Sequence, residues 1–379
     1  MTSRPATRLQ VSGYRFASRR IEQALRGGEV ATAEPPARVR SLATGCLLAA
    51  LMVFGGAALA FVRPHPGLDG APIVMAAESG ALYVRVDDTL HPVLNLASAR
   101  LIAATAASPR RVRQSDIDHA KRGPLLGIPG APPALAPPLS DTESGWTVCD
   151  AGSPPTTTVI AGPVRPLQPL AAERRLLVTT GPGGAGRTYL LYGGRRAAVS
   201  LTDPAVTRAL RWDGQPPPTV SALLLNAVPE APPITAPRVT GAATLPEFPV
   251  GGATTLCVTW AQPPSGGPET TVSAGAALPL PPGAAPVALA QADGAGPALD
   301  AVYLPPGNTA YVRASGVRYL IAGTGVRFAI PDDATARSLG LTAPPTPAPW
   351  PMLVGLPQGP ELSRQHALVA RDVVPSDPA

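Results

Sequence analysis

The sequence predicts an α+β protein that one helix anchors in a membrane, with most of the chain on the far side. Three observations predict this class. Residues 42–62 form an uncharged apolar run, an arginine-rich segment precedes it, and three similar strand–turn–strand–helix patterns follow it. We expect an elongated extracytoplasmic region of repeated β-β-α modules around a central β domain.

The apolar run reads LATGCLLAALMVFGGAALAFV, which is 21 residues without a charge. At about 1.5 Å rise per residue it spans roughly 30 Å, the thickness of a bilayer core. A buried soluble helix is one alternative, and a signal peptide cleaved after Ala58-Leu59-Ala60 is another. The long segment before the run, and the length of the run itself, favour a single transmembrane helix over both.

Charge predicts the orientation of that helix. Residues 1–41 hold eight arginines and three glutamates, and the rest of the chain is nearly neutral. The positive-inside rule therefore places 1–41 in the cytoplasm as an arm, 42–62 in the plasma membrane and 63–379 outside the cytoplasm. The arm carries +5 of the net charge of +6. We expect no nucleic-acid partner, because such a partner would need basic residues clustered on the folded region.

Residues 10–28 of the arm predict an amphipathic helix, with Ser12 as its N-cap and Gly27-Gly28 as its stop. An isolated helix of this length is marginal in water. We therefore expect it to fold against the anionic inner leaflet or in the groove of a partner protein. The residues expected to make that contact are Tyr14, Arg15, Phe16, Arg19, Arg20 and Ile21.

Three segments of the exported region resemble one another: residues 81–102, 188–210 and 317–341. Each predicts an aromatic-containing strand, a turn, a second strand with a basic residue near its start, and a capped helix. Those basic residues are His91, Arg195 and Arg327, and the caps are Asn95, Asp203 and Asp332. An Asx side chain accepts from the free amides of a first turn. The repeated Asx residues are therefore predicted as caps rather than as catalytic acids.

Clusters of the 50 prolines and 38 glycines divide the exported region. The divisions that they predict are a first repeat module (72–125), a central β domain with a second repeat-like unit (139–262), a Pro/Gly-rich connector (263–300), a third repeat module (301–343) and a Pro-rich C-terminal segment (344–379).

The stretch GPGGAGRT (181–188) differs by one residue from the phosphate-binding pattern G-x-x-x-x-G-K-[ST]. A phosphate loop needs a helix directly after it, whereas here TYLLY and a double glycine predict a strand and a hairpin turn. The predicted topology also places the stretch outside the cell, where ATP is scarce. The residues that match the pattern are therefore predicted as a hairpin connector, not a cofactor site: Gly181, Gly186, Arg187 and Thr188.

Other catalytic and metal-binding patterns are absent from the sequence, which has no G-x-S-x-G, no H-E-x-x-H and only four scattered histidines. We therefore expect no catalytic residue, no cofactor and no metal. Cys46 lies in the apolar run, which leaves Cys149 and Cys257 in the exported part. In an oxidising compartment these two can form a disulfide, or they can remain two buried thiols.

Long motifs along the chain strongly resemble the EccB family, a core membrane component of the actinobacterial type VII (ESX) secretion systems. The motifs are QVSGYRF and RRIEQAL in the arm, residues 72–102, RGPLLGIPGAP (122–132), ESGWTVCD (143–150), LLNAVPEAPPI (224–234), DAVYLPPG (300–307) and residues 349–372. The chain is shorter than is usual for the family, and its middle region around 238–300 is trimmed.

The resemblance implies a structural scaffold subunit of the inner-membrane secretion complex. It implies that the arm helix contacts the EccC motor and the EccD channel, that exported domains self-associate, and that EccE and the mycosin protease are neighbours. It also implies a disulfide, which we assign to Cys149 and Cys257.

Two other functions stay open. Some family members carry an ATPase attribution, so one is an ATP-hydrolysing secretion component, for which these residues suggest no mechanism. The other is a cell-wall-binding extracytoplasmic module, because small repeated modules outside the membrane often dock on peptidoglycan.

Overall fold

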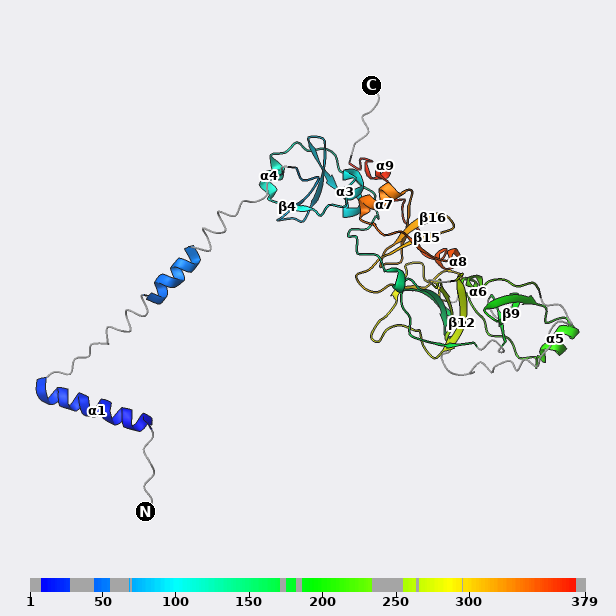
Figure 1. The fold of residues 1–379 in the computed structure, drawn as a ribbon, viewed down its shortest axis with the longest axis horizontal. Helices are drawn as coiled ribbons and strands as arrows, with labels where there is room; N and C mark the ends of the chain where they lie inside the picture. The colour runs from blue at the N-terminus through cyan, green and yellow to red at the C-terminus, as the bar shows by residue number, and fades with distance from the viewer. Residues whose placement is uncertain are drawn as a thin grey trace, which may run out of the picture. The chain divides into compact units, whose positions relative to one another are not determined.

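A computed structural model describes residues 8–27, 44–54, 68, 70–170, 175–181, 186–233, 255–263, 266–294 and 296–372. The chain divides into two units, residues 1–65 and residues 66–379. In the first unit, α1 (Arg8–Gly27) and a second helix at 44–54 are described (Figure 1).

The prediction that Ser12 caps α1 is wrong. The helix begins at Arg8, and the Ser12 hydroxyl donates to the Leu9 carbonyl at 2.9 Å. A serine inside a helix can bond back to the preceding turn in this way, so the helix continues through it.

The predicted transmembrane span is only partly described. The helix at 44–54 lies inside it and its side chains are exposed, whereas residues 42–43 and 55–62 lie outside the described residues. None of the helices in the described ranges combines the length and the apolar content that crossing a bilayer requires. The span therefore remains a prediction from the sequence.

The second unit contains three repeats of one topology: three antiparallel strands, a helix, a return parallel to the first strand, and another short helix. The first comprises β1 (Ile73–Ala76), β2 (Leu82–Val86), β3 (Thr89–Val93), α3 (Leu96–Ala103), β4 (Arg110–Val112) and α4 (Gln114–Asp118). The second comprises β8 (Leu176–Thr179), β9 (Thr188–Tyr192), β10 (Arg195–Val199), α5 (Pro204–Leu210) and α6 (Ala222–Ala227). The third comprises β15 (Ala310–Ala314), β16 (Val317–Ile321), β17 (Arg327–Ile330), α7 (Asp333–Leu339), β18 (Thr346–Pro347) and α8 (Trp350–Leu353).

The fourth strand closes each sheet in the same way. β4 runs parallel to β1 and β18 runs parallel to β15, whereas in the second repeat a single parallel bridge between Thr179 and Thr219 takes that place. The predicted caps are confirmed: the side chains of Asn95, Asp203 and Asp332 accept from the amides of the first helical turn. The sequence pattern therefore corresponds to the second strand, the third strand and the following helix of each repeat. The first strand and the parallel fourth strand lie outside the pattern.

The central sheet has seven strands in the order β13-β14-β6-β5-β11-β12-β7. Their bounds are β5 (Trp146–Ala151), β6 (Thr156–Ala161), β7 (Gln168–Pro169), β11 (Thr255–Ala261), β12 (Glu269–Gly275), β13 (Val287–Ala288) and β14 (Ala301–Tyr303). A 3₁₀ turn (Asp141–Glu143) precedes the sheet, and α9 (Arg364–Ala367) is the last helix that the structure describes. The central sheet thus draws on residues from 146 to 303, on both sides of the second repeat.

The predicted Pro/Gly-rich connector and the Pro-rich C-terminal segment both contribute strands or helices to the fold. Residues 263–300 contain β12 and β13, and β12 pairs with β11 along its full length. Residues 344–379 contain β18, α8 and α9, and Leu362 and Ala367 are fully buried. Proline and glycine lie at the ends of these short elements and dominate the composition of the two segments. The β-branched and apolar residues between them still form strands and pack in the core.

Helices join the repeats to one another. α3 and α7 pack together in one core that the first and third repeats share. α6 and α8 pack together and against β5, within the core of the central sheet. Figure 1 shows both pairs in the second unit, with α3 beside α7 and α8 beside α6. The third repeat therefore contacts the first through one helix and the second through the other.

Candidate functional site

The amphipathic helix α1 presents three sides along its length. Tyr14, Ile21 and Leu25 share one side at helical spacing, and all three are exposed. Arg15, Arg19 and Arg26 follow the next side. An apolar stripe bordered by arginines is therefore open in the residues that the structure describes.

Phe16 and Arg20 lie together on a third side of α1, with the Arg20 guanidinium 5.9 Å from the centre of the Phe16 ring. Of the six contact residues expected from the sequence, Tyr14 and Ile21 form the apolar stripe and Arg15 and Arg19 form its basic border. Phe16 and Arg20 point elsewhere, because residues two positions apart diverge around a helix.

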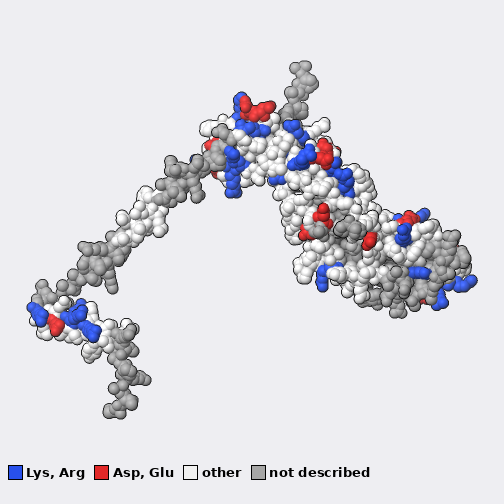
Figure 2. Space-filling model, in the orientation of Figure 1, with Lys and Arg blue, Asp and Glu red and all other residues white. Residues whose placement is uncertain are grey.

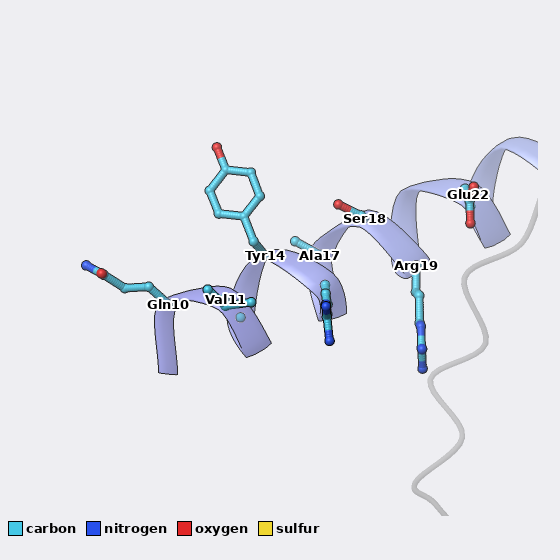
Figure 3. A pocket seen from close by; sticks show the side chains of 9 residues that line it. Gln10, Val11, Tyr14, Ala17, Ser18, Arg19 and Glu22 are labelled. Carbon is cyan, nitrogen blue, oxygen red and sulfur yellow. The ribbon is translucent and has the colours of Figure 1, made fainter. Parts of the chain in front are cut away.

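A shallow hollow runs along α1, lined by residues from Gln10 to Glu22 (Figure 3). Tyr14 and Arg19 point in different directions there, from neighbouring sides of the helix. Figure 2 shows basic side chains along this helix, whose described sequence contains one acidic residue, Glu22. A surface of this kind suits a partner helix or an anionic membrane surface.

The stretch 181–188 joins β8 and β9, which pair antiparallel with Thr179 opposite Thr188. Residues 182–185 lie outside the described part. A strand rather than a helix follows Arg187 directly, so the stretch does not lead into a helix N-terminus as a phosphate loop does. A Cβ on Gly186 would lie 1.9 Å from the Thr180 carbonyl oxygen, which explains glycine there. Gly181, Gly186, Arg187 and Thr188 thus lie at a hairpin connection.

Asp150, in β5, joins the central sheet to the second repeat. Its carboxylate accepts from the Ser221 amide at 2.6 Å, the Ser221 hydroxyl at 2.8 Å and the Thr157 hydroxyl at 2.9 Å. Burial raises the pKa of Asp150, against the opposing effect of these hydrogen bonds, and the charge of Asp300 raises it further. Ser221 caps α6, so the carboxylate fixes the start of the helix that packs on the sheet.

Each repeat places a guanidinium over a tyrosine of its second strand. The distances to the ring centre are 5.9 Å for Arg122 over Tyr83, 5.6 Å for Arg196 over Tyr189 and 5.8 Å for Arg327 over Tyr319. Arg196 and Arg327 lie on the third strand of their repeats and form β-bridges with Glu230 and Gln358, which come later in the chain. In the first repeat the arginine is the later residue: Leu90 of the third strand forms a β-bridge with Arg122.

Arg195 begins β10, as the pattern predicts, but the counterpart of Arg327 is its neighbour Arg196. Arg196 donates to the Leu225 carbonyl at 3.0 Å, and Arg327 donates to the Leu356 carbonyl at 3.1 Å. These arginines hold each repeat together. Sequence periodicity alone misses them, because the bridge partner lies about 30 residues further on.

Cys149 and Cys257 form a disulfide between directly opposite residues of β5 and β11, which confirms the assignment made from the family resemblance. Among the described residues no group of histidine, cysteine or acidic side chains is placed to hold a metal ion. The candidate site that remains is the exposed stripe of α1.

A family model described as "Type VII secretion system ESX-1, transport TM domain B" matches residues 3–254 and 246–376. This chain belongs to the EccB family. The family match runs through α1, the central sheet and all three repeats, so it covers both units of the chain.

Curated EccB relatives match over almost their whole length. The ESX-3 secretion system ATPase EccB3 of Mycolicibacterium smegmatis is 34% identical, over 98% of this chain and 92% of the relative. The ESX-1 secretion system ATPase EccB1 of Mycobacterium tuberculosis is 30% identical, over 100% of this chain and 98% of the relative.

Solved EccB structures share the fold. A chain of an intact ESX-5 inner membrane complex aligns with a TM-score of 0.69 and 29% identity, covering 100% of this chain and 98% of that one. A chain of an EccB3 dimer from the ESX-3 core complex aligns with a TM-score of 0.67 and 29% identity, covering 79% of this chain and 100% of that one.

Proposed function

We propose that this chain is a structural scaffold subunit of a type VII secretion inner-membrane complex and supports protein export by holding other subunits in place. The observation that carries the proposal is the end-to-end match to a chain of an intact ESX-5 inner membrane complex. The repeats and the disulfide suit a scaffold, because both restrict motion in the folded region.

The cytoplasmic contact of this scaffold is α1. Its stripe of Tyr14, Ile21 and Leu25 is exposed in the described structure, and a helix with such a stripe gains stability when a groove covers it. We propose the EccC motor and the EccD channel as the partners that supply the groove, with Arg15 and Arg19 directed at the anionic inner leaflet.

The extracytoplasmic contact is the second unit. The solved EccB3 dimer chain aligns with 79% of this chain, which is close to the share that residues 66–379 make up. This supports self-association through the exported region, anchored by a single membrane pass at 42–62. We propose EccE and the mycosin protease as neighbours on this side.

The test is a pull-down of the assembled complex from membranes of cells that produce Tyr14→Asp, Ile21→Asp. The proposal expects the variant to stay in the membrane fraction and to lose EccC and EccD, because two carboxylates cannot enter an apolar groove without a large desolvation penalty. Phe16→Asp, on another side of the same helix, is the matched control and should retain them. Full recovery of both subunits with the double variant would contradict the proposal.

ATP hydrolysis is the second candidate, because the names of the curated relatives include the word ATPase. The hairpin at 181–188 offers no helix N-terminus for a phosphate, so the scaffold proposal expects no turnover from the purified full-length chain. Turnover that Arg187→Ala abolishes, and that Arg195→Ala on the neighbouring strand leaves intact, would establish the second candidate and contradict our interpretation of this loop. Gly186→Ala is a poor probe because of its clash with Thr180.

A further inference from the structure

Helices of the three repeats pair with helices of the same kind. α3 and α7 each follow the third strand of a repeat, and they pack together. α6 and α8 each follow the fourth strand or its equivalent, and they also pack together. The repeats thus form a series, first–third–second, in which the two kinds of helix contact alternate.

The second repeat ends that series with α5, the counterpart of α3 and α7. Its core is built from the second repeat alone: Leu177, Leu190, Val199, Val206 and Leu210, with Tyr192, Leu201 and Trp212 half-buried at its edge. In the other two repeats the equivalent core is shared. In the described part of the chain, no other repeat contributes to the core beneath α5.

Positions that are buried in the paired helices α3 and α7 are partly exposed in α5. Ala99 and Ala336, both four residues after their caps, are buried in the shared core, whereas their counterpart Thr207 is half-exposed. The edge of the second sheet shows the same difference: Val86 and Ala322 pack against the shared core, whereas their counterpart Tyr192 packs against the core of its own repeat.

Charge also fits a like-with-like contact. Arg100 of α3 donates to the Leu339 carbonyl at the C-terminus of α7 at 2.9 Å, so a cation meets the negative end of a helix. Arg208 of α5 stands in the place of Arg100, five residues after its cap, and is exposed. Leu210, the counterpart of Leu339, offers the matching carbonyl at the end of a second α5.

We propose that α5 pairs with α5 of a second copy of this chain, so that two chains make the contact that α3 and α7 make within one. This inference rests on the self-association proposed above and names its surface. The length of the chain also supports it. The alignment with the M. smegmatis relative runs over 479 positions, whereas this chain has 379 residues, so at least 100 positions of the relative have no counterpart in this chain. That number exceeds the length of one repeat such as 310–358.

Cysteine cross-linking of the full-length chain in membranes tests the contact. In a Cys46→Ser background, Thr207→Cys should form a dimer between copies on mild oxidation. Ala276→Cys, an exposed position directly after β12, is the control and should not. A Thr207→Cys cross-link to a different protein, or none at all, would overturn the proposal.

Charge reversal provides a second readout in case the cross-link perturbs the fold. Arg208→Glu places an anion against helix C-terminal carbonyls and should weaken self-association of the purified full-length chain about tenfold, whereas Arg195→Glu in the same repeat should not. A dimer of unchanged affinity with Arg208→Glu refutes the α5 contact and leaves the scaffold function standing. A wild-type chain that neither self-associates nor joins the complex refutes both.

Discussion

At the scale of single residues, hydrogen-bonding side chains in the second unit hold separate elements together. Asn95 shows this: its side chain accepts from the Ser98 amide and donates to the Ile128 carbonyl, both at 2.9 Å, so one amide group caps α3 and ties down a distant loop. The cap can be predicted from local sequence. The contact with Ile128 cannot, because it depends on tertiary packing.

The cap of α7 makes a prediction about pH. The amide of Thr335 donates to Asp332 and holds the pKa of that carboxyl below its ordinary value. A lowered pKa in the folded state stabilises the protein above the unfolded pKa, and that contribution disappears as the pH falls through the folded pKa. Asp332→Ala should therefore lower the free energy of unfolding by about 1 kcal/mol at neutral pH and by less in acid.

Chemical denaturation of both proteins across a pH series measures that difference. Asp332→Asn is the matched control, since asparagine also caps a helix but does not titrate in this range. A cost of Asp332→Ala that stays constant down to the most acidic pH would show that the carboxylate charge has no role in the cap.

Asp150 makes the second prediction. All three of its described hydrogen bonds come from donors, so the NH₂ group of an asparagine would face a donor. Asp150→Asn should therefore lower the free energy of unfolding by about 1–3 kcal/mol. Asp88→Asn, at an exposed turn, should leave it nearly unchanged. Equal denaturation midpoints for all three proteins would mean that this network does not fasten α6 to the sheet.

At the scale of elements, the repeats show what a sequence can and cannot predict. The hairpin of β9 and β10 is visible in the sequence because Gly193 and Gly194 supply the two positive φ angles of its turn, 52° and 71°. β4 is three residues long and pairs with a strand more than 30 residues earlier, so no local period marks it. The pairing of Arg196 with Glu230 also joins residues far apart in the sequence, so local periodicity does not predict it.

The disulfide between β5 and β11 is expected to stabilise the fold. It links β5 to β11 across 108 residues of sequence that contain the whole second repeat. In the chain-entropy model, closing such a loop stabilises the fold by about 4–5 kcal/mol. Cys149→Ala, Cys257→Ala should lower the melting temperature of the second unit by several degrees, and Cys46→Ala should not. Identical melting curves for the two variants would contradict this role.

At the scale of the whole molecule, the sequence predicts repeats but not how they associate. The first and third repeats pack together although the central sheet and the second repeat lie between them in the chain. That association depends on the surfaces of α3 and α7, which differ from α5 by single side chains such as Ala99 and Thr207. The candidate site in α1 is predictable as an amphipathic helix, whereas the contact between Phe16 and Arg20 on another side of it is seen only in the structure.

The proposed function requires α1 and the repeats to lie on opposite sides of the membrane. Protease added to intact spheroplasts tests this topology, with one epitope tag before α1 and another after residue 379. We predict that the C-terminal tag is lost while the N-terminal tag and α1 survive until detergent is added. Survival of the C-terminal tag in intact spheroplasts, with both tags lost after detergent, would contradict the account.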